Sequence, residues 1–332
     1  MTTTNGTTRR VGLATCAALP DLDDDRPVIG ALAERGVDAE PVVWDDPDVD
    51  WSAYDLVVVR STWDYSPRRD EFVAWARSVP AIANPADVIA WNTDKGYLRV
   101  LETAGVPVIP TIWLDPARHL SKRAVHTRMP AFGDFVVKPV VSAGAKDAGR
   151  YQPVSAQSRA LAIQHAVGLL DGGRAVMIQP YMTSVDTAGE TCLVFIDGTL
   201  RHAVRKSALL TGPSRDDDAP FLREQMEPAR ATDAQVEVAT RALEVAAADL
   251  GRTDPFLYAR VDLVTRDDGT PVVIELELTE PSLWLQHAGD AGTLDAFADA
   301  IVDRLACPVG PGGRPDAPMD RQALMGPVSS RR

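Results

Sequence analysis

The chain has 332 residues, of which 45% are hydrophobic and 24% charged, so it can form two or three compact units with buried cores. Its net charge of −13 and pI near 4.8 argue against nucleic acid or an anionic membrane as the main partner. No apolar run is as long as a membrane span and the polar N-terminus lacks a signal-peptide core, so we expect a cytoplasmic protein. Three scattered cysteines do not make a disulfide framework or a zinc site. The sequence leaves the assembly state open, and a homodimer is compatible with it.

The first part of the chain predicts alternating strands and helices. We expect strands at 10–15, 37–44 and 55–60, with a helix over 26–35. The third strand, DLVVVR, is nearly all apolar, as a strand buried on both faces should be. This alternation predicts a parallel, doubly wound sheet. The absence of a G-x-G-x-x-G loop after the first strand argues against nicotinamide or flavin binding.

The loop that follows the third strand, RSTWDY at 60–65, combines a cation, hydroxyls, an anion and two aromatic rings. Ligands of doubly wound sheets bind beyond the carboxyl ends of the strands, which is where this loop lies. We therefore expect Arg60 to bind a substrate carboxylate and Asp64 an ammonium group. The alternative is a helix N-cap with a packed tryptophan. The predicted substrate-binding residues are Arg60, Ser61, Trp63, Asp64 and Tyr65.

A helix is predicted to start at Asn92, a good capping residue, and to end before Gly105. The segment 106–112 should then lead away as an extended link. Lys95 falls in the first turn of this predicted helix, where the helix dipole disfavours a cation unless an anion is nearby. Lys95 is therefore either a solvated lysine or a contact for an anion.

The segment FVVKPV at 135–140 predicts a strand that carries Lys138 in an apolar context. Such a lysine is desolvated unless a partner or a ligand phosphate meets it. The small residues of 141–149 follow, and loops of this kind can bring backbone N–H groups to phosphates and close over them. The loop lacks the G-x-x-x-x-G-K-[ST] pattern of a P-loop.

The next segments predict a helix at 155–170, a strand at 175–182 and a hairpin at 190–206. A two-residue turn at Asp197-Gly198 would place Glu190 opposite Arg205. Helices are expected at 229–250 and 294–305.

The stretch 260–284, RVDLVTRDDGTPVVIELELTEPSLW, predicts a second hairpin that turns at Asp268-Gly269. Counting outward from a two-residue loop places Asp262 opposite Glu275 and Arg260 opposite Glu277, all on one face. The other face of the returning strand should be apolar, at Val272, Ile274, Leu276 and Leu278.

Two opposed carboxylates in a strand pair require compensation. Directly opposed residues lie about 4.5–5.5 Å apart at Cβ, and at an effective dielectric of about 20 two carboxylates ~5 Å apart repel by roughly 3 kcal/mol. A divalent cation is the simplest compensation, and an oxygen-only ligand set suits Mg²⁺. The alternative is an exposed sheet face on which Arg260 pairs with Glu277 in solvent. A one-residue bulge would change this pairing.

An ordered set of segments resembles the ATP-grasp superfamily of carboxylate-amine ligases, from about residue 10 to 305. The segments are DKGYLRVLETAGVPVIPT, FVVKPVVSAGA, IQPYM, GETCLVF, AVRK, YARVDLV and VIELELTEPSLWL. With RSTWDY, they are most similar to the branch that contains the D-cycloserine-forming ligase. Family members usually carry Asn where this chain has Glu277, which leaves open how a second metal ion is held.

The resemblance implies an α/β fold with three parts. These are an N-terminal Rossmann-like substrate domain (10–110), a small lid (111–178) and an α+β central domain with a mixed sheet (179–306). The segments 1–9 and 307–332 are expected to be disordered tails.

The resemblance also assigns roles to residues around ATP and Mg²⁺, of which two ions are expected. Asp262, Glu275 and Glu277 would hold the metal, and Arg205, Lys206 and Arg260 would stabilise charge during transfer. The nucleotide contacts would be Lys95 and Lys138 at the phosphates, Ser142, Ala143 and Gly144 in the loop above them, Gln179, Tyr181 and Met182 at the adenine, and Asp186, or else Glu190, at the ribose.

The implied activity is ATP-dependent formation of an amide through an acyl phosphate, of the kind used in antibiotic biosynthesis. The substrate would be an amino-acid-like carboxylate. The amine could come from a second molecule or, by ring closure, from the same one. A nucleotide-binding regulator without turnover and a metal hydrolase that does not use ATP are the alternatives.

Overall fold

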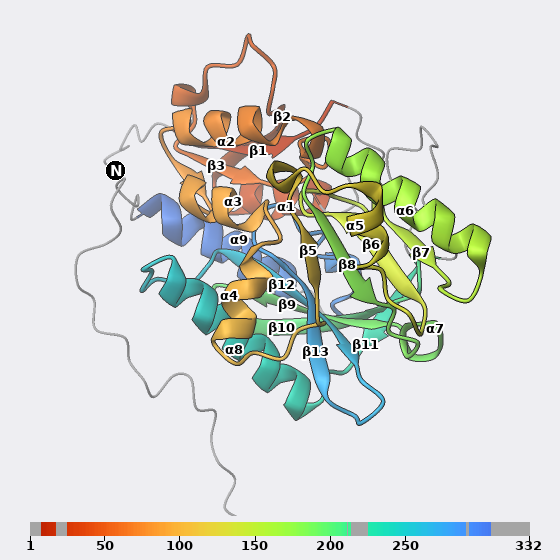
Figure 1. Ribbon diagram of the computed structural model, residues 1–332. Coiled ribbons are helices and arrows are strands. Elements are labelled where there is room, and N and C mark those ends of the chain that lie inside the picture. Colours follow the sequence, from red (N-terminus) through yellow and green to blue (C-terminus); the bar gives the residue numbers. More distant parts are fainter. Residues whose placement is uncertain (1–7, 18–24, 211, 214–224, 290–291, 307–332) are drawn as a thin grey trace, which may run out of the picture.

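The computed structural model describes residues 8–17, 25–210, 212–213, 225–289 and 292–306, arranged around three sheets (Figure 1). The predicted disordered tails, 1–9 and 307–332, lie outside these ranges except at residues 8 and 9, and Arg9 already begins a strand. Among the described helices, none combines the length and apolarity needed to cross a membrane.

The N-terminal sheet has four parallel strands in the order β2-β1-β3-β4, which confirms the predicted parallel sheet. Its third strand is buried along its whole length, as its apolar sequence indicated. The elements of this part are β1 (Arg9–Thr15), α1 (Asp25–Glu34), β2 (Val37–Val43), β3 (Leu56–Val59), α2 (Arg69–Ser78) and β4 (Ile82–Ala83).

The helix predicted between Asn92 and Gly105 begins later, as α4 (Tyr97–Thr103), after a turn that follows a separate helix α3 (Ala86–Asn92). Asn92 ends the first helix, and Lys95 lies in the turn between the two. The amide of Lys95 donates to Val140 O at 3.1 Å, so a tertiary hydrogen bond replaces a helical one. The prediction that Lys95 occupies the first turn of a helix is therefore wrong.

The lid sheet has the order β5-β8-β6-β7 and is antiparallel. Helix α6 packs against it and closes a hydrophobic core formed within residues 114–178. Its elements are β5 (Ile112–Leu114), α5 (Lys122–His126), β6 (Phe135–Pro139), β7 (Gly149–Tyr151), α6 (Ala156–Asp171) and β8 (Val176–Pro180). Strand β8 thus continues past the expected lid boundary at 178.

The central sheet has the order β11-β10-β9-β12-β13, with antiparallel neighbours throughout. Val108 of the preceding extended segment adds an isolated parallel bridge to Val273. Helix α8 covers β12 and β13, and α9 packs on β9 and on α1 of the N-terminal part (Figure 1). The elements are α7 (Val185–Ala188), β9 (Glu190–Ile196), β10 (Thr199–Lys206), β11 (Met226–Ala229), α8 (Asp233–Asp249), β12 (Tyr258–Thr265), β13 (Pro271–Glu277) and α9 (Gly292–Ala306).

Strand β11 was not expected from the sequence, and it ends at Ala229, the residue at which the predicted helix 229–250 should begin. The helix begins later, at Asp233, where Thr232 and Gln235 form a reciprocal capping box. Edge pairing with β10 therefore decides the state of residues 226–229.

The hairpin of β12 and β13 has the predicted partners, Arg260 opposite Glu277 and Asp262 opposite Glu275, but not the predicted loop. The amide of Arg266 donates to Thr270 O, so the connection is one residue longer than a two-residue turn. A bulge between Asp262 and Leu263 then shifts the register by one. The two deviations cancel, and the carboxylates still oppose each other.

The bulge also divides the apolar residues of β13 between two cores, so the predicted single apolar face is wrong. Leu276 and Leu278 belong to the core beneath α8, whereas Val272 and Ile274 pack with Ile109 on the other side. A bulge of one residue reverses the side on which the preceding residues point.

The hairpin of β9 and β10 carries a bulge between Leu200 and His202. It shifts the partner of Glu190 from the predicted Arg205 to Lys206. Gly189, at φ 69°, permits the approach, because a Cβ there would lie 2.6 Å from Lys206 O.

Candidate active site

A cavity of about 490 Å³ lies between the lid sheet and the central sheet, with the N-terminal loop 60–65 at one end. Most of the predicted nucleotide and metal residues line it. Its predicted members are Trp63, Tyr65, Lys95, Lys138, Ser142, Ala143, Gly144, Gln179, Tyr181, Met182, Glu190, Lys206, Arg260, Glu275 and Glu277.

The centre of the site is a group of three carboxylates. Asp262, Glu275 and Glu277 each offer one oxygen, and these oxygens lie within 4.8 Å of one another. Arg260 donates from Nε and Nη2 to the two oxygens of Asp262, at 2.8 and 2.9 Å, and also pairs with Glu277. The solvated salt bridge between Arg260 and Glu277 is excluded, because the Arg260 side chain is 5% exposed.

The three carboxyl groups differ in how easily they ionise. Burial alone would raise the pKa of Asp262, but Arg260 and Lys206 lower it to about 2. Burial also opposes the ionisation of Glu275, yet Lys95 and Lys138 hold its pKa below the ordinary value. For Glu277, burial and the two neighbouring carboxylates outweigh Arg260 and raise the pKa well above the usual range. The cluster therefore lacks enough positive charge to ionise fully.

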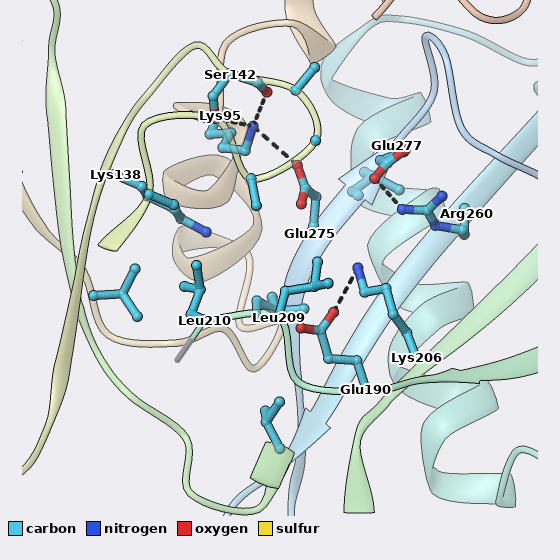
Figure 2. A pocket seen from close by; sticks show the side chains of 18 of the residues that line it. Lys95, Lys138, Ser142, Glu190, Lys206, Leu209, Leu210, Arg260, Glu275 and Glu277 are labelled. Atoms are coloured by element: carbon cyan, nitrogen blue, oxygen red, sulfur yellow. Dashed lines mark hydrogen bonds and ion pairs between the residues drawn. The ribbon is translucent and has the colours of Figure 1, made fainter. Parts of the chain in front are cut away.

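Two lysines approach the cluster from the lid side (Figure 2). Lys95 Nζ lies 3.1 Å from Glu275 Oε1 and donates to Ser142 O at 2.7 Å. Lys95 thus connects the loop that contains Ser142 to strand β13, which carries Glu275. Lys138 also lines the cavity, and burial lowers its pKa. Among the described residues, no carboxylate lies within ion-pair distance of Lys138.

Lys206 occupies the opposite side, 2.9 Å from Glu190 Oε2 and 3.4 Å from Asp262 Oδ2 (Figure 2). Arg205 points elsewhere: its side chain is 48% exposed and pairs with Glu227. The bulge in β10 is the reason, since it exchanges the sides of these two residues.

The carboxylate set fits Mg²⁺, which prefers oxygen ligands. The missing positive charge at Glu277 is what a divalent cation would supply. A second group with ligand atoms in range, Glu190, Cys192 and Asp262, is a poorer candidate. The ammonium group of Lys206 already contacts both of its carboxylates.

The segment 179–182 between the lid sheet and the central sheet, which was predicted as the adenine hinge, contributes Gln179, Tyr181 and Met182 to the cavity. The amide of Tyr181 already donates to Asp134 O at 2.8 Å, so an adenine contact must use other groups of the hinge. Asp186 does not line the cavity. It accepts the Tyr181 hydroxyl and pairs with Arg150 at 3.1 Å.

The predicted substrate contacts at Arg60 and Ser61 are not in the cavity. Arg60 is 2% exposed and pairs with Asp25 at 3.0 Å, and the Ser61 hydroxyl donates to the same carboxylate. Arg60 also donates to Pro281 O at 3.2 Å, so it braces the segment after β13.

Only the aromatic members of the loop reach the cavity. Trp63 lines it, and its indole donates to Glu280 O at 3.1 Å. Tyr65 lines it as well, with its ring stacked on Phe72. Asp64 instead accepts the indole N–H of Trp44 at 2.8 Å.

Several cavity residues were missed by the sequence analysis, and Glu280 is the most notable. It lies three residues beyond Glu277 in the same acidic stretch, which was a usable signal. The others have no local signature, because burial beside the site depends on the fold. The missed lining residues include Asn92, Leu209, Leu210, Met226, Glu280, Ser282 and Trp284.

The chain resembles known proteins over most of its length. Residues 11–86 match the family described as D-cycloserine synthetase DcsG, N-terminal domain. Over 294 residues the chain is 40% identical to the cycloserine biosynthesis protein DcsG of Streptomyces lavendulae, covering 87% of this chain and 96% of that protein.

Solved structures point the same way. The crystal structure of D-cycloserine synthetase DcsG matches with a TM-score of 0.78 and 38% identity, over 89% of this chain and 99% of that one. A D-alanine–D-alanine ligase from Bacillus anthracis complexed with ATP shares the fold, with a TM-score of 0.61 and 16% identity over 90% of this chain and 97% of that one. The chain therefore belongs to the DcsG family of ATP-grasp ligases.

Proposed function

We propose that this ligase closes the ring of D-cycloserine or of a close analogue. Its relative of known name makes that compound, and the two chains share 40% of their residues over nearly the whole relative. D-cycloserine is a cyclic amide in which the carboxyl carbon is joined to a nitrogen on the side-chain oxygen. Opening that amide gives β-aminooxy-D-alanine, which is the simplest substrate for ring closure.

The carboxylate cluster would hold Mg²⁺ through Asp262, Glu275 and Glu277. When bound, the metal neutralises the negative charge of the phosphates and of the cluster itself. We propose two ions, which would together supply the positive charge that phosphoryl transfer needs. Glu275 and Glu277 each have two carboxylate oxygens, so one glutamate could bind both ions. Glu277 also takes the place of an uncharged family residue and so adds a negative charge for the second ion.

Among the described residues, no carboxylate pairs with Lys138, so its ammonium group would bind a phosphate. Lys95 holds Ser142 O, so the loop 142–144 lies over the same end of the cavity. Backbone N–H groups of such a small-residue loop can approach phosphates closely. Lys206 and Arg260 complete the positive charge around the transferred group. Arg205 has no part in the proposal.

The nucleotide base would lie at the hinge, against Tyr181 and Met182. For the ribose we propose Glu190, because it lines the cavity and Asp186 does not. Asp186 is better placed to hold Tyr181 in position through its hydroxyl.

The reaction follows from this arrangement. An oxygen of the substrate carboxylate attacks the γ-phosphorus of ATP, the bond to the β-phosphate oxygen breaks, and ADP leaves. The aminooxy nitrogen then attacks the acyl carbon, the bond to phosphate breaks, and the nitrogen loses a proton. Positioning and charge neutralisation are the main demands of phosphoryl transfer. The lid must exclude water, because water would compete for the acyl phosphate.

One observation carries the proposal: Glu275 and Glu277, whose oxygens lie within 4.8 Å of one another and of an oxygen of the buried Asp262, line the same cavity as Lys138, a buried lysine without an ion-pair partner in the described part of the chain. A ligand that combines a metal ion with phosphate would neutralise both the carboxylates and the Lys138 ammonium group. A regulator without turnover would gain nothing from holding Glu277, whose ionisation is opposed by burial and by the two neighbouring carboxylates.

The test is to incubate the protein with ATP, Mg²⁺ and β-aminooxy-D-alanine, and to measure ADP and the product mass. We expect ADP release that depends on the amino acid, and a product lighter than the substrate by one water. Substrate-dependent ADP release with a linear dipeptide product would refute ring closure, and no ADP release across a wide amino-acid panel would refute the ligase reaction.

Glu275→Gln is the matching variant. It should slow ADP release by about 100-fold or more, since losing residues that merely support metal ligands already costs roughly 10–100-fold. Glu244→Gln, which changes an exposed glutamate on α8, is the control for the loss of one charge. Near-normal turnover of Glu275→Gln with a native circular dichroism spectrum would contradict the metal assignment.

A further inference from the structure

Glu280 differs from the other glutamates of the cavity in having no cationic partner. Glu190, Glu275 and Glu277 pair with Lys206, Lys95 and Arg260, respectively (Figure 2). Glu280 makes no ion pair with any residue that the structure describes. Its carboxylate is hydrogen bonded to the Tyr65 hydroxyl.

The backbone around Glu280 is held in place from the N-terminal domain. Trp63 donates to the carbonyl of Glu280, and Arg60 donates to the next carbonyl, that of Pro281, at 3.2 Å. The carbonyl of Thr279, on the other side, lies 2.8 Å from the Tyr258 hydroxyl. The carboxylate is therefore presented to the cavity in a fixed position, as a binding group requires.

Aromatic rings surround this end of the cavity. Trp63, Tyr65 and Trp284 line it together with Glu280. Ring faces attract cations and do not compensate a buried carboxylate by themselves. A carboxylate in such a place carries a desolvation cost unless a positively charged group is supplied.

We propose that Glu280 is the group that binds the ammonium of an amino-acid substrate. The ammonium donates to the carboxylate and lies against the surrounding rings. The assignment rests on the proposed function, because it takes the substrate of that reaction to be an amino acid. It replaces Asp64, which the sequence had suggested for this role and which bonds to Trp44 instead.

The position of Glu280 agrees with this role. The charges of Lys95, Glu275 and Arg260 each shift the pKa of Glu280, so it lies within electrostatic range of the carboxylate cluster. The ammonium and carboxylate groups of an amino acid are separated by a single carbon. An amino acid bound to Glu280 by its ammonium would therefore direct its carboxylate toward Arg260 and the phosphates. Burial, with Glu275, raises the pKa of Glu280 to about 7, so a bound cation would also restore its full charge.

The test compares two rings that differ only in the amino group. D-cycloserine carries it, and isoxazolidin-3-one does not. Binding of each to the protein with Mg²⁺ and ADP is measured by calorimetry. The wild type should bind D-cycloserine about tenfold or more tightly than isoxazolidin-3-one, as expected for a charge-assisted hydrogen bond, and Glu280→Gln should lose this preference.

Two further variants keep the comparison decisive. Tyr65→Phe leaves the carboxylate but removes the hydrogen bond that orients it, and should reduce the preference partly. Glu244→Gln should retain it fully. The thermal shift of each variant with Mg²⁺ and ATP reports whether the nucleotide site is intact. If Glu280→Gln fails to fold, Tyr65→Phe decides.

A preference that survives in a folded Glu280→Gln protein overturns the assignment. So does a wild type without the preference, whether it binds both rings equally or neither. If ADP release with β-aminooxy-D-alanine persists in that case, the ligase reaction stands and only the role of Glu280 falls. A preference for the amino ring without ADP release would instead keep the ammonium site and reject the reaction.

Discussion

Asp262 and Glu280 are acidic residues of one site whose surroundings shift their pKa values in opposite directions. Burial opposes the ionisation of both. Asp262 has Arg260 and Lys206 at bonding distance, and its pKa falls to about 2. Glu280 has the Tyr65 hydroxyl as its hydrogen-bond partner, and its pKa rises to about 7. A cation in direct contact thus decides whether a buried carboxylate ionises.

The raised pKa of Glu280 predicts a pH-dependent stability. The folded protein keeps a proton that the unfolded chain, with a pKa of 4.5, has lost. The stability of the wild type should therefore fall as pH rises from about 4.5 to 7, and the loss is complete above that window. Tyr65, Lys95, Glu275 and Arg260 are the groups around it.

Glu280→Gln removes this titration. Without nucleotide and metal, its free energy of unfolding relative to the wild type should rise by roughly 1–3 kcal/mol between pH 5 and pH 8. Urea unfolding at the two pH values measures the difference. A difference that is the same at both pH values, or that changes in the opposite direction, contradicts the argument.

The residue scale is also where the sequence was least informative. The types of Arg60, Asp64 and Arg205 suited a substrate site, but none of the three lines the cavity. Their partners, Asp25, Trp44 and Glu227, are between 20 and 35 positions away in the chain. Residue type determines what a side chain can bind, and tertiary packing determines what it meets.

At the scale of single elements, strand β13 is an edge strand whose outer side is completed by the backbone of 107–109 at Val273 and by side chains beyond it. Asn92 donates to Leu276 O at 2.8 Å and accepts from the amide of Leu278 at 2.7 Å. The Tyr97 hydroxyl accepts from the amide of Leu276 at 3.0 Å. These bonds replace a sixth strand and fix the register of the strand that carries Glu275 and Glu277.

Asn92→Ala should therefore affect both stability and metal use. It leaves two buried backbone groups unpaired, each of which costs about 1–3 kcal/mol, so we expect a loss of roughly 2–6 kcal/mol in the free energy of unfolding. The Mg²⁺ concentration for half-maximal ADP release should rise as well.

Tyr97→Phe is the comparison for Asn92→Ala, because it removes one hydrogen bond and keeps both bonds of Asn92. Its cost should be about half as large. Denaturant unfolding and Mg²⁺ titration of both variants check the prediction. A loss below about 1 kcal/mol for Asn92→Ala, with unchanged Mg²⁺ dependence, would show that the strand holds its register without the side chain.

At the scale of the whole molecule, the N-terminal and central sheets share one core. Val11 and Leu13 of β1 lie in the same hydrophobic cluster as Val194 of β9 and as Phe297 and Ile301 of α9. The lid has a core of its own, formed within residues 114–178. Helix α9 thus joins two sheets, and the lid packs as a separate unit beside them (Figure 1).

This arrangement predicts two classes of amide hydrogen exchange. Amides of β1, β3, β9 and β12 should exchange together through global unfolding, whereas amides of β6 and β8 should open at lower free energy. Saturating Mg²⁺ and ATP at 100 times the dissociation constant adds about 2.7 kcal/mol, so lid amides should slow by up to about 100-fold. Mass spectrometry of exchange measures both. A single opening free energy for lid and central strands would contradict it.

The sequence by itself determined the order and type of most elements, the parallel sheet and the acidic hairpin. Periodicity and turn residues are local, so they can be read from the chain. It also pointed to Lys138 and to the Asp262–Glu275 pair, but counting from the turn reached that pair only because the longer turn and the bulge cancel each other.

Tertiary structure decided the rest. The bulges in β10 and β13 select Lys206 over Arg205 and divide the apolar face of β13, because register responds to packing on both sides of a sheet. The side chain of Asn92 forms hydrogen bonds with the backbone of β13 and does not cap its own helix. Glu280 meets Tyr65 only when the N-terminal domain folds onto the central one, so the carboxylate without a cation could not be recognised before the fold was known.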